Sequence, residues 1–515
     1  MPVIPFAEWL PDQPSGAGSV GTRNVIARTA KSYGPMPSPT PITLALPERA
    51  MGDVTLLGAD RAVFSFTATQ HHIYRYLKSV GVDWVDVSKA AGYNTLDFDN
   101  GGSWDSTSFG TRAIFTNYLD PVQSYDIKTS SLFADLSAAA PKAKYCCTIR
   151  DFLFLGSTND PIDGEQPRRL WWSSIGDAGD WPSPGTDLAI QRQSDFQDLE
   201  QSELGHLRGI VGGNLSGADG AAFLERGIVR ISYTGSPAIF SFEVAEGAAG
   251  TSSPWSIVSR RMPTENGTRA VAYYYSDSGF QFFDGASASS IGTQKFDRFI
   301  YDDLLQSRRA QMLGVAVPYA NLILWAYHSA TNSTSLYDRL LVYNWELQRG
   351  TLCEMTPFEW LEENISSSLT LDELDPFGTL ETIATSFDSM AWVTSKPAVS
   401  LWDSTHRLNT LTGQPMAATV ETVEIGLPGR RMKLHNTVRP VIEGSDSGAT
   451  VAVGHRERQA NPVSYDVDVP VNILGACGLR SSGRYVRLRL KLPAAAPFTH
   501  LSGIEAEPVP EGRLR

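Results

Sequence analysis

The feature of this sequence that most constrains its fold is a short phrase that recurs with variations. Each copy is a β-rich run, then a turn of small residues, then a tryptophan near an aspartate. Units of this kind hold only a few short strands, so they cannot bury both faces of a sheet alone and must pack against their neighbours. The phrase occurs around Trp84, Trp104, Trp181, Trp345 and Trp402. This repetition predicts radially arranged sheets, and therefore a β-propeller whose tryptophans fill the gaps between blades.

Residues 51–415 show the same pattern at larger scale. Short runs of β-branched and aromatic residues, such as RAVFSFTAT, DFLFLGST and NLILWAYHS, are separated by turns rich in Gly, Asp, Asn and Ser. The runs group into units of roughly 40–55 residues, which is the period of a propeller blade. We therefore predict an all-β chain in which residues 51–415 form a β-propeller of about six blades.

The two ends of the chain differ from this middle part. Residues 1–50 are rich in Pro, Gly and Ser, which excludes a helix and favours an extended N-terminal arm across a surface. Residues 416–515 have longer strands with stricter alternation. In Tyr485–Leu492 apolar and basic residues alternate, so one face of the strand is expected to be buried and the other to be positive. This pattern predicts a β-sandwich docking (platform) domain over 416–515.

Charge is distributed unevenly between these parts. The net charge is −13, but residues 416–515 hold 13 Lys and Arg against 10 Asp and Glu, which leaves −16 for residues 1–415. We predict that the basic side chains dock an acidic neighbouring subunit, with charge complementarity setting the register. A solvated strand face and a direct grip on DNA are the alternatives. The predicted interface consists of Arg430, Arg431, Lys433, Arg484, Arg487, Arg489 and Lys491. Charge reversal at Arg487 and Arg489 is expected to impair docking without unfolding the subunit.

No residues can be nominated for catalysis, cofactor binding or metal binding. The sequence has no G-x-x-x-x-G-K-[ST] loop, no G-x-S-x-G elbow and no H-E-x-x-H motif. Adjacent side chains in a strand point to opposite faces, so His71 and His72 are not expected to share an ion. The pair Glu362–Glu363 is expected to be solvated loop charge. We predict that the protein is not an enzyme and needs no cofactor.

The chain resembles the tail nozzle or tail hub proteins of short-tailed bacteriophages, also described as tubular or packaged-DNA-stabilisation proteins. The resemblance covers almost the whole chain, and the order of the motifs carries it rather than any one of them. The matching segments are WLPD followed by NVI, WDSTSFGTRAIFTNYLDPVQSYD, RRLWWSSIGDAGDWP, GFQFFDG followed by FDRFIYDDL, LILWAY with LLVYNWE, and LWDSTHRLNTLTG leading into ATVETVEIGLPGRR and SGRYVRLRL.

The resemblance implies a structural virion protein located in the tail and assembled in the host cytoplasm. Six copies would form a ring at the distal end of the tail and attach to tail adaptor or head–tail connector proteins, with tail fibres or spikes as further candidate partners. The phage genome would pass through the ring during ejection without specific binding. No membrane anchor is expected, since the stretch 313–327 is too short to span a bilayer.

An alternative from another class is a propeller that binds a receptor or cleaves glycans. Sialidase-like propellers carry turns of the form S-x-D-x-G-x-x-W, which Ser103–Phe109 approaches only loosely. Such turns stabilise the fold without catalysis, because Asp caps turn amides and Trp fills space. Glycoside hydrolysis also needs two carboxylates at a controlled separation, and the sequence does not single out such a pair.

Overall fold

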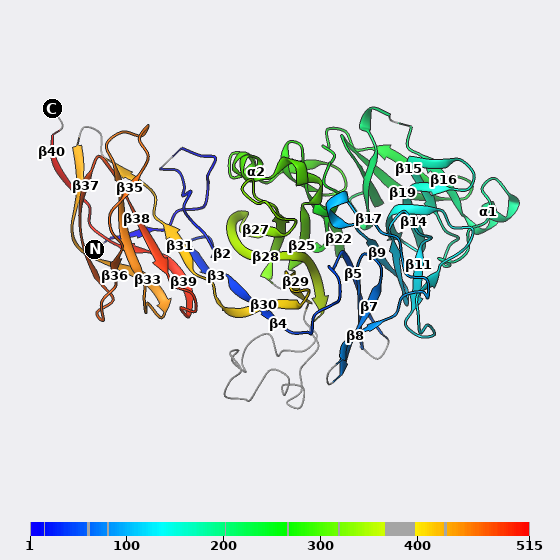
Figure 1. Ribbon diagram of the computed structural model, residues 1–515. Coiled ribbons are helices and arrows are strands. Elements are labelled where there is room, and N and C mark those ends of the chain that lie inside the picture. Colours follow the sequence, from blue (N-terminus) through cyan, green and yellow to red (C-terminus); the bar gives the residue numbers. More distant parts are fainter. Residues whose placement is uncertain are drawn as a thin grey trace.

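The computed structural model describes residues 2–14, 16–58, 62–79, 82–200, 202–264, 267–317, 320–365, 397–426 and 430–513. Almost all of its regular structure is β, in two parts that lie side by side (Figure 1). The larger part consists of sheets arranged around a centre, and the smaller is a β-sandwich that holds both ends of the chain. The prediction of an all-β propeller with a C-terminal sandwich is confirmed.

Five four-stranded antiparallel sheets follow one another along the chain as blades one to five. Within each blade the strands follow sequence order, and most connections are short, although the one between β15 and β16 contains the helix α1 (Asp187–Arg192). The strands are β5 (Gly52–Leu57), β6 (Val63–Ala68), β7 (Ile73–Ser79) and β8 (Val82–Asp86); β9 (Asp105–Phe109), β10 (Arg112–Thr116), β11 (Gln123–Asp126) and β12 (Ala134–Asp135); β13 (Lys142–Ile149), β14 (Phe152–Asp160), β15 (Gly164–Trp172) and β16 (Asp195–Asp198); β17 (Leu207–Leu215), β18 (Ala218–Leu224), β19 (Ile228–Gly235) and β20 (Ile239–Val244); β21 (Val258–Thr264), β22 (Gly267–Ser276), β23 (Gly279–Phe283) and β24 (Ala288–Ser290).

The remaining propeller strands form one seven-stranded sheet that supplies two blades. Its order is β25 (Leu313–Val317), β26 (Leu322–Tyr327), β27 (Tyr337–Asn344), β28 (Arg349–Ile365), β29 (Pro397–Asp403), β30 (Leu408–Pro415) and β4 (Pro37–Pro41). The first half of β28 pairs with β27, and the half from Phe358 onward pairs with β29. This second half also contacts β25 and β5, so it is the inner strand of a seventh blade between blades six and one.

The structure thus has one blade more than the sequence suggests. The seventh blade contains the Trp402 copy of the phrase but is not a complete repeat along the sequence, because it shares β28 with blade six and takes its outer strand from the N-terminal region. Strand β4 has the sequence PSPTP and pairs with β30, with Thr40 opposite Thr410. Proline cannot donate to a strand ladder, and β4 lies at the edge of the sheet, where proline is tolerated.

The sandwich consists of two sheets around one apolar core. One sheet contains β1 (Val3–Pro5), β2 (Val25–Thr29), β3 (Ser32–Pro35), β33 (Arg430–Gly444), β37 (Cys477–Gly483), β39 (Phe498–Glu505) and β40 (Val509–Arg513). The other contains β31 (Ala418–Glu421), β32 (Ile425–Gly426), β34 (Thr450–Arg456), β35 (Ser464–Tyr465), β36 (Val469–Pro470) and β38 (Tyr485–Leu492). As the alternation predicts, Val486, Leu488, Leu490 and Leu492 of β38 all belong to the core.

Residues 1–50, predicted to be an arm, are integrated into both parts of the molecule. Strands β1, β2 and β3 belong to the sandwich, and β4 completes the propeller. Val25, Tyr33 and Met36 are at most 1% exposed. Where the segment is extended, in β1 to β4, its backbone is paired within sheets and does not lie free on a surface.

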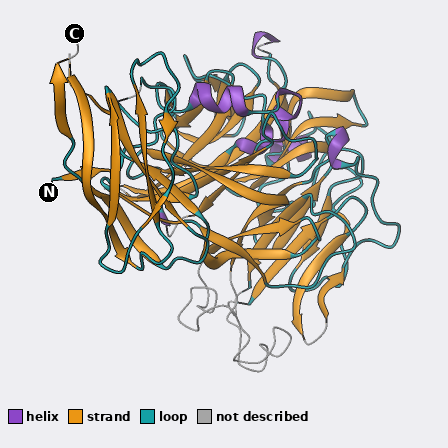
Figure 2. Ribbon diagram, turned by 60° about the vertical axis from the view of Figure 1, so that its left-hand side comes forward, coloured by secondary structure: helices purple, strands orange, loops and turns teal. Residues whose placement is uncertain are grey.

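In the described ranges, helical structure consists of short turns, most of them on one side of the propeller (Figure 2). They are α1 (Asp187–Arg192), α2 (Asp297–Asp303) and the 3₁₀ turns η1 (Phe98–Asn100), η2 (Ser202–Leu204), η3 (Pro254–Ser256) and η4 (Gln306–Gln311). Three of them, η1, η3 and η4, line cavities at the centre of the propeller or next to it.

The tryptophans of the recurrent phrase occupy different places in the blades. Trp84 lies in β8, Trp104 directly before β9, Trp181 in the loop after β15, Trp345 after β27 and Trp402 in β29. The phrase is therefore not one structural repeat, since an aromatic ring is needed wherever a gap opens and not at a fixed strand position. Trp104 does bridge blades as expected: its Nε1 donates to the Thr69 carbonyl of blade one at 2.8 Å, and its ring meets Phe115 of blade two.

The N-terminal segment fastens the sandwich to the propeller around α2. Trp9 is fully buried, stacks on Phe296 with ring centroids 5.9 Å apart, and meets Phe299 edge-on at 5.5 Å. The Asp12 carboxylate accepts hydrogen bonds from the backbone N–H groups of Arg298 (2.9 Å) and Phe299 (2.8 Å). Because the first N–H groups of a helix have no partner inside it, Asp12 caps α2 from a distant part of the chain.

A second set of contacts supports the same joint. Arg349, at the start of β28, donates to the carbonyls of Thr29 (2.9 Å) and Ala30 (3.0 Å) in the β2–β3 turn. Asn344 Nδ2 donates to the Ala27 carbonyl at 3.1 Å. Blade six therefore holds the β2–β3 hairpin of the sandwich through side chain to backbone bonds.

We expect the substitution Trp9→Ala to lower the free energy of unfolding by about 3–5 kcal/mol, because it leaves a large apolar cavity at the joint. Denaturant unfolding followed by tryptophan fluorescence and far-UV circular dichroism would measure the change. The control is Tyr301→Ala, which removes a half-exposed aromatic ring from α2 itself and is expected to change stability by about 0.5 kcal/mol or less. Equal losses in both variants would contradict a specific role for Trp9.

Candidate docking surface and central channel

The basic residues of β38 do not form a free positive face. Arg487 is 8% exposed and pairs with Glu421 of β31 at 3.3 Å. Lys491 contacts Asp468 at 2.7 Å, and the guanidinium of Arg489 lies 3.6 Å from the centroid of the Tyr465 ring. The alternation shows correctly which side of β38 is polar, but acidic and aromatic side chains from distant segments cover that side.

Of the other four predicted docking residues, three lie on the opposite sheet of the sandwich. Arg430, Arg431 and Lys433 are on β33, which belongs to the other sheet of the sandwich. Arg431 pairs with Glu457, while Arg430 is exposed. Arg484 precedes β38, and its guanidinium lies 5.7 Å from the Tyr485 ring centroid. The seven residues are thus not one continuous patch, and a docking role remains a prediction best addressed at the exposed Arg430.

Charge reversal at Arg487 cannot serve as a test of docking alone, because it would place two acidic groups together in a buried site. We expect Arg487→Ala to lower the free energy of unfolding by about 3–5 kcal/mol, since Glu421 loses its buried partner. Arg430→Ala is expected to change it by about 0.5 kcal/mol or less. Thermal and denaturant unfolding of the two variants side by side would measure both values. A stable Arg487→Ala protein would show that the pair is not needed for folding.

The inner strands of all seven blades surround a central cavity of about 850 Å³. Its wall is mainly polar and includes carboxylates, hydroxyls, guanidinium groups and three tryptophans. Representative residues from successive blades are Asp53, Asp105, Thr148, Arg208, Ser259, Gly314 and Trp360. A cavity at the axis of a propeller is a common location for a binding site, so its side chains are the first candidates for function.

The carboxylates of this cavity hold neighbouring blades together. Asp105 of β9 accepts a hydrogen bond from the backbone N–H of Cys146 in β13 at 2.8 Å. Asp53 of β5 accepts one from Trp360 Nε1 of β28 at 3.0 Å. Thr148 Oγ1 of β13 donates to the Ser108 carbonyl of β9 at 2.7 Å. Inner strands of adjacent blades belong to different sheets, so these side chains supply the polar contacts between them.

Burial shifts the titration of these carboxyl groups. It raises the pKa of Asp105 to about 7, against hydrogen bonds from the N–H groups of Cys146 and Ser106 that favour the charged form. Burial also raises the pKa of Asp53. Glu362, whose Oε2 accepts from Trp402 Nε1 at 2.9 Å, has a pKa well above normal because of burial and the nearby Asp53. The expectation that Glu362 is a solvated loop charge is wrong, since it lies in β28 and is 2% exposed.

A raised carboxyl pKa makes stability depend on pH. Below about pH 4 the Asp105 carboxyl is protonated in both states, and between its unfolded value of 3.8 and its folded value of about 7 only the folded chain keeps the proton. Its contribution to stability is therefore fully present below pH 3.8 and is lost as the pH rises toward 7.

We accordingly expect Asp105→Asn to reduce the fall in melting temperature between about pH 5 and about pH 8, because the amide does not ionise. Differential scanning fluorimetry across this range would measure it. Asp302→Asn, at an exposed position of α2, is the control and should leave the slope as in the unmodified protein. An unchanged slope in Asp105→Asn would show that other groups cause the pH dependence.

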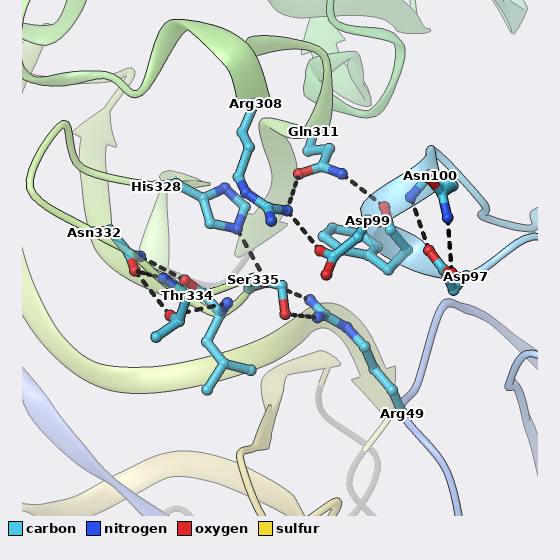
Figure 3. Close-up of polar contacts among 12 residues, drawn as sticks. Arg49, Asp97, Asp99, Asn100, Arg308, Gln311, His328, Asn332, Thr334 and Ser335 are labelled. Carbon is cyan, nitrogen blue, oxygen red and sulfur yellow. Dashed lines mark hydrogen bonds and ion pairs between the residues drawn. The ribbon is translucent and has the colours of Figure 1, made fainter.

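The segment between blades one and two, which we call the cover, lines a second cavity that shares Tyr145, Arg208 and Trp255 with the central one. Its turn η1 contacts η4, which precedes blade six, and Arg49 (Figure 3). Arg308 contacts Asp99 at 2.9 Å, and Gln311 Nε2 donates to the Phe98 carbonyl at 2.7 Å. The Arg49 guanidinium lies 3.8 Å from the centroid of the Phe98 ring. An ion pair, a hydrogen bond and a cation–π contact thus hold this cover in place.

The β26–β27 loop completes the anchor. Arg49 Nη2 and His328 Nε2 both bond to the Ser335 carbonyl, at 2.9 and 3.1 Å (Figure 3). His328 is fully buried, and burial lowers its pKa to about 4. The imidazole is therefore neutral at pH 7, which matches its role as a single donor to a carbonyl next to two arginine side chains.

A smaller cavity of about 450 Å³ lies beneath this cover and joins the central one at Tyr145, Arg208 and Trp255. Its wall combines aromatic rings with cationic groups. Tyr145 and Trp255 have ring centroids 6.3 Å apart, and Lys144 Nζ lies 4.7 Å from the Tyr118 ring. Tyr118 has a φ of 67°, an unfavourable conformation for a residue with a bulky side chain. No one sequence motif brings these residues together, because Lys144 and Tyr145 lie in β13, whereas Tyr118 and Trp255 come from connections in other parts of the chain.

Some expectations about site chemistry can be compared with contacts. His71 Nδ1 pairs with Glu48 and His72 Nδ1 with Asp86, so the two rings serve different partners. Within the described ranges, no group of three or more His, Cys, Asp and Glu side chains is placed to hold a metal ion. In the same part of the chain, no helix has the length and apolar character needed to cross a bilayer.

No family model matches the sequence, and no curated protein is significantly similar to it. Among solved structures, the extracellular domain of the putative one component system BT4673 from B. thetaiotaomicron is 9% identical, with a TM-score of 0.34; the match covers 86% of this chain and 48% of that one. The computationally designed Ika8 protein is 7% identical, with a TM-score of 0.36 and coverage of 78% and 99%. YCF48 bound to a D1 peptide is 12% identical, with a TM-score of 0.33 and coverage of 64% and 91%. The chain spans about half the length of the first of these proteins, and similarities this weak carry no functional information.

Proposed function

We propose that this chain is a structural virion protein that forms the ring-shaped distal nozzle of a short bacteriophage tail. Six copies would retain the packaged genome and conduct it during ejection into the host. The ring would attach to adaptor or head–tail connector proteins, with fibres or spikes as further neighbours. The protein would be located in the tail of the virion, which is assembled in the host cytoplasm. The role is mechanical and electrostatic and involves no reaction.

One observation carries this proposal: several of the motifs on which the resemblance is based pack together in the structure. WLPD contributes Trp9 and Asp12, FDRFIYDDL contributes Phe296, LILWAY contributes Trp325, and LLVYNWE contributes Tyr343. Four of these residues are aromatic and belong to one buried cluster, in which the Phe296 ring lies 5.9 Å from Trp9 and 6.3 Å from Tyr343. The shared motifs thus concern the joint between propeller and sandwich, and not merely propeller composition.

Electrostatics supports the same role. Each phosphate that a protein neutralises adds affinity through counterion release, so a basic wall would slow a passing genome. Residues 1–415, which include the whole propeller, carry −16. Arg487 and Lys491, the obvious candidates for gripping DNA, are paired with Glu421 and Asp468. A subunit with this charge distribution suits a conduit that DNA must leave.

A second candidate function is a receptor-binding or glycan-cleaving tail protein, and the cavity beneath the cover favours its binding form. Tyr118, Tyr145 and Trp255 offer flat apolar faces, while Lys144 and Arg208 offer positive charge. Apolar walls with a few converging polar groups are typical of small-molecule sites. An acidic saccharide would suit this combination, because its ring faces are apolar and its carboxylate is anionic.

The proposal is tested by three measurements on the purified chain. We expect closed rings in negative-stain electron micrographs, no release of reducing ends from bacterial surface polysaccharide, and no retention of double-stranded DNA at low salt. The last result follows because binding to phosphates would be strongest at low ionic strength.

The opposite results are equally informative. A monomer that binds or hydrolyses acidic oligosaccharide, and that loses binding on Trp255→Ala, would overturn the nozzle proposal in favour of the second candidate. Tyr301→Ala, on an exposed face of α2, is the matched aromatic control. Rings that hold DNA tightly at low salt would contradict the electrostatic part of the proposal.

A further inference from the structure

A turn at the end of the sandwich holds two large aliphatic side chains in solvent. It lies between β36 and β37, and we call Ile473 and Leu474 the knob. Ile473 is fully exposed and Leu474 is 75% exposed, and Val467 nearby is 85% exposed. Exposed apolar residues that cluster in this way mark surfaces that bind other molecules.

The turn is held in shape by its own hydrogen bonds. Asn472 Oδ1 accepts from the N–H groups of Leu474 (2.9 Å) and Ala476 (3.2 Å). The N–H of Gly475 donates to the Asn472 carbonyl at 2.9 Å, and Gly475 has a φ of 69°, which favours glycine. The knob therefore does not have to be ordered on binding, which lowers the entropic cost of a contact made there.

The chain also contains an apolar groove of about 330 Å³ where the sandwich meets the propeller. Strand β2, the β3–β4 connection, the β25–β26 hairpin, β29 and β30 form its walls. Of its lining residues only Thr412 has a polar side chain; the others include Ile26, Met36, Leu322, Leu324 and Leu411. A cavity of about 150 Å³ can hold a benzene molecule, so this groove has room for two aliphatic side chains.

Knob and groove also match in charge. The carboxylate of Asp446 lies next to the turn, 3.5 Å from the position of a Cβ on Gly475. Arg28 is exposed on β2, two residues from Ile26 and on the same side of the strand. Neither Asp446 nor Arg28 forms an ion pair with any residue in the described ranges. An acidic group thus stands beside the knob and a basic group beside the groove.

One copy of the chain cannot bring its own knob and groove together. Strands β36 and β37 lie in the sandwich at the end away from the propeller, whereas β25, β29 and β30 belong to the propeller (Figure 1). We infer that the knob of one copy inserts into the groove of the next, with Asp446 facing Arg28. The two surfaces are different, so the contact is heterologous, and repeating it generates a ring when the rotation closes. The inference deepens the proposed function by naming the contact between ring subunits.

The first test removes the knob. We expect the double variant Ile473→Ser/Leu474→Ser to raise the dissociation constant of self-association by about 30-fold, the typical loss for a central apolar anchor. Sedimentation velocity over a concentration series would measure it. Ile162→Ser, at an exposed hairpin position of blade three, is the matched control and should assemble like the unmodified chain. Unchanged assembly of the knob variant, or an unmodified chain that stays monomeric, would overturn the inference.

The second test uses the two-sidedness of the contact. Thr412→Arg blocks the groove with a bulky charge at a half-buried position, and its melting temperature would confirm that it folds. We expect the knob variant and the groove variant each to be monomeric, and their equimolar mixture to form heterodimers and nothing larger, because one intact knob meets one intact groove. A mixture that stays monomeric would contradict the pairing of these two surfaces.

The third test exchanges charge. Asp446→Arg alone places a cation opposite Arg28 and is expected to weaken assembly about tenfold, while Asp446→Arg combined with Arg28→Asp is expected to restore it. If the double variant does not recover assembly, Asp446 does not face Arg28, and the pairing of knob and groove is contradicted. Rings that persist in all these variants would reject this contact and leave the nozzle proposal standing. Knob-dependent dimers without rings would support this contact and reject the nozzle proposal.

Discussion

The structure depends on the pairing of β4 with β30. A ring of blades is held by contacts between separate sheets, so its weakest place is where the last blade meets the first. Here the seventh blade shares β28 with blade six and takes its outer strand from residues 37–41. The bond from Trp360 to Asp53 lies on the same seam, at the axis of the ring. Pairing at the rim and a hydrogen bond at the centre together close the propeller.

The strand that closes the ring is also part of the connection to the sandwich. Before β4, the same segment supplies three sandwich strands, places Trp9 against α2 and caps that helix with Asp12. The contacts of Arg349 with the β2–β3 turn add a second attachment. Movement of the sandwich relative to the propeller would therefore break aromatic packing, a helix cap and backbone hydrogen bonds together. A subunit built this way can transmit the orientation of one part to the other.

The sequence predicts the parts of this fold that have a local signature. Short β-branched runs between turns indicate the propeller, and the period-two alternation of β38 identifies its core side, where Val486 and Leu488 are buried. Contacts between distant segments leave no such signature. The distant hydrogen-bond partners of residues 1–41 begin at Gln294, so their prolines indicate only extended chain. From the sequence alone Arg487 is expected to be a surface charge, because its partner Glu421 is distant in the chain. Glu362 is expected to be solvated for the same reason, since its partner Trp402 lies in β29. The cavity beneath the cover is assembled from strands and turns that are distant in the sequence and share no motif.

The position of β1–β4 has a consequence for synthesis of the chain. These strands leave the ribosome first, but their partners β30 and β39 are among the last to follow. Throughout translation the nascent protein therefore carries strand edges with no complement, the state in which chains most readily aggregate. The prolines of PSPTP leave gaps in the row of amide donors that a neighbouring nascent chain would need. The prolines of β4 thus reduce aggregation of the nascent chain until its partner strand β30 has been synthesised.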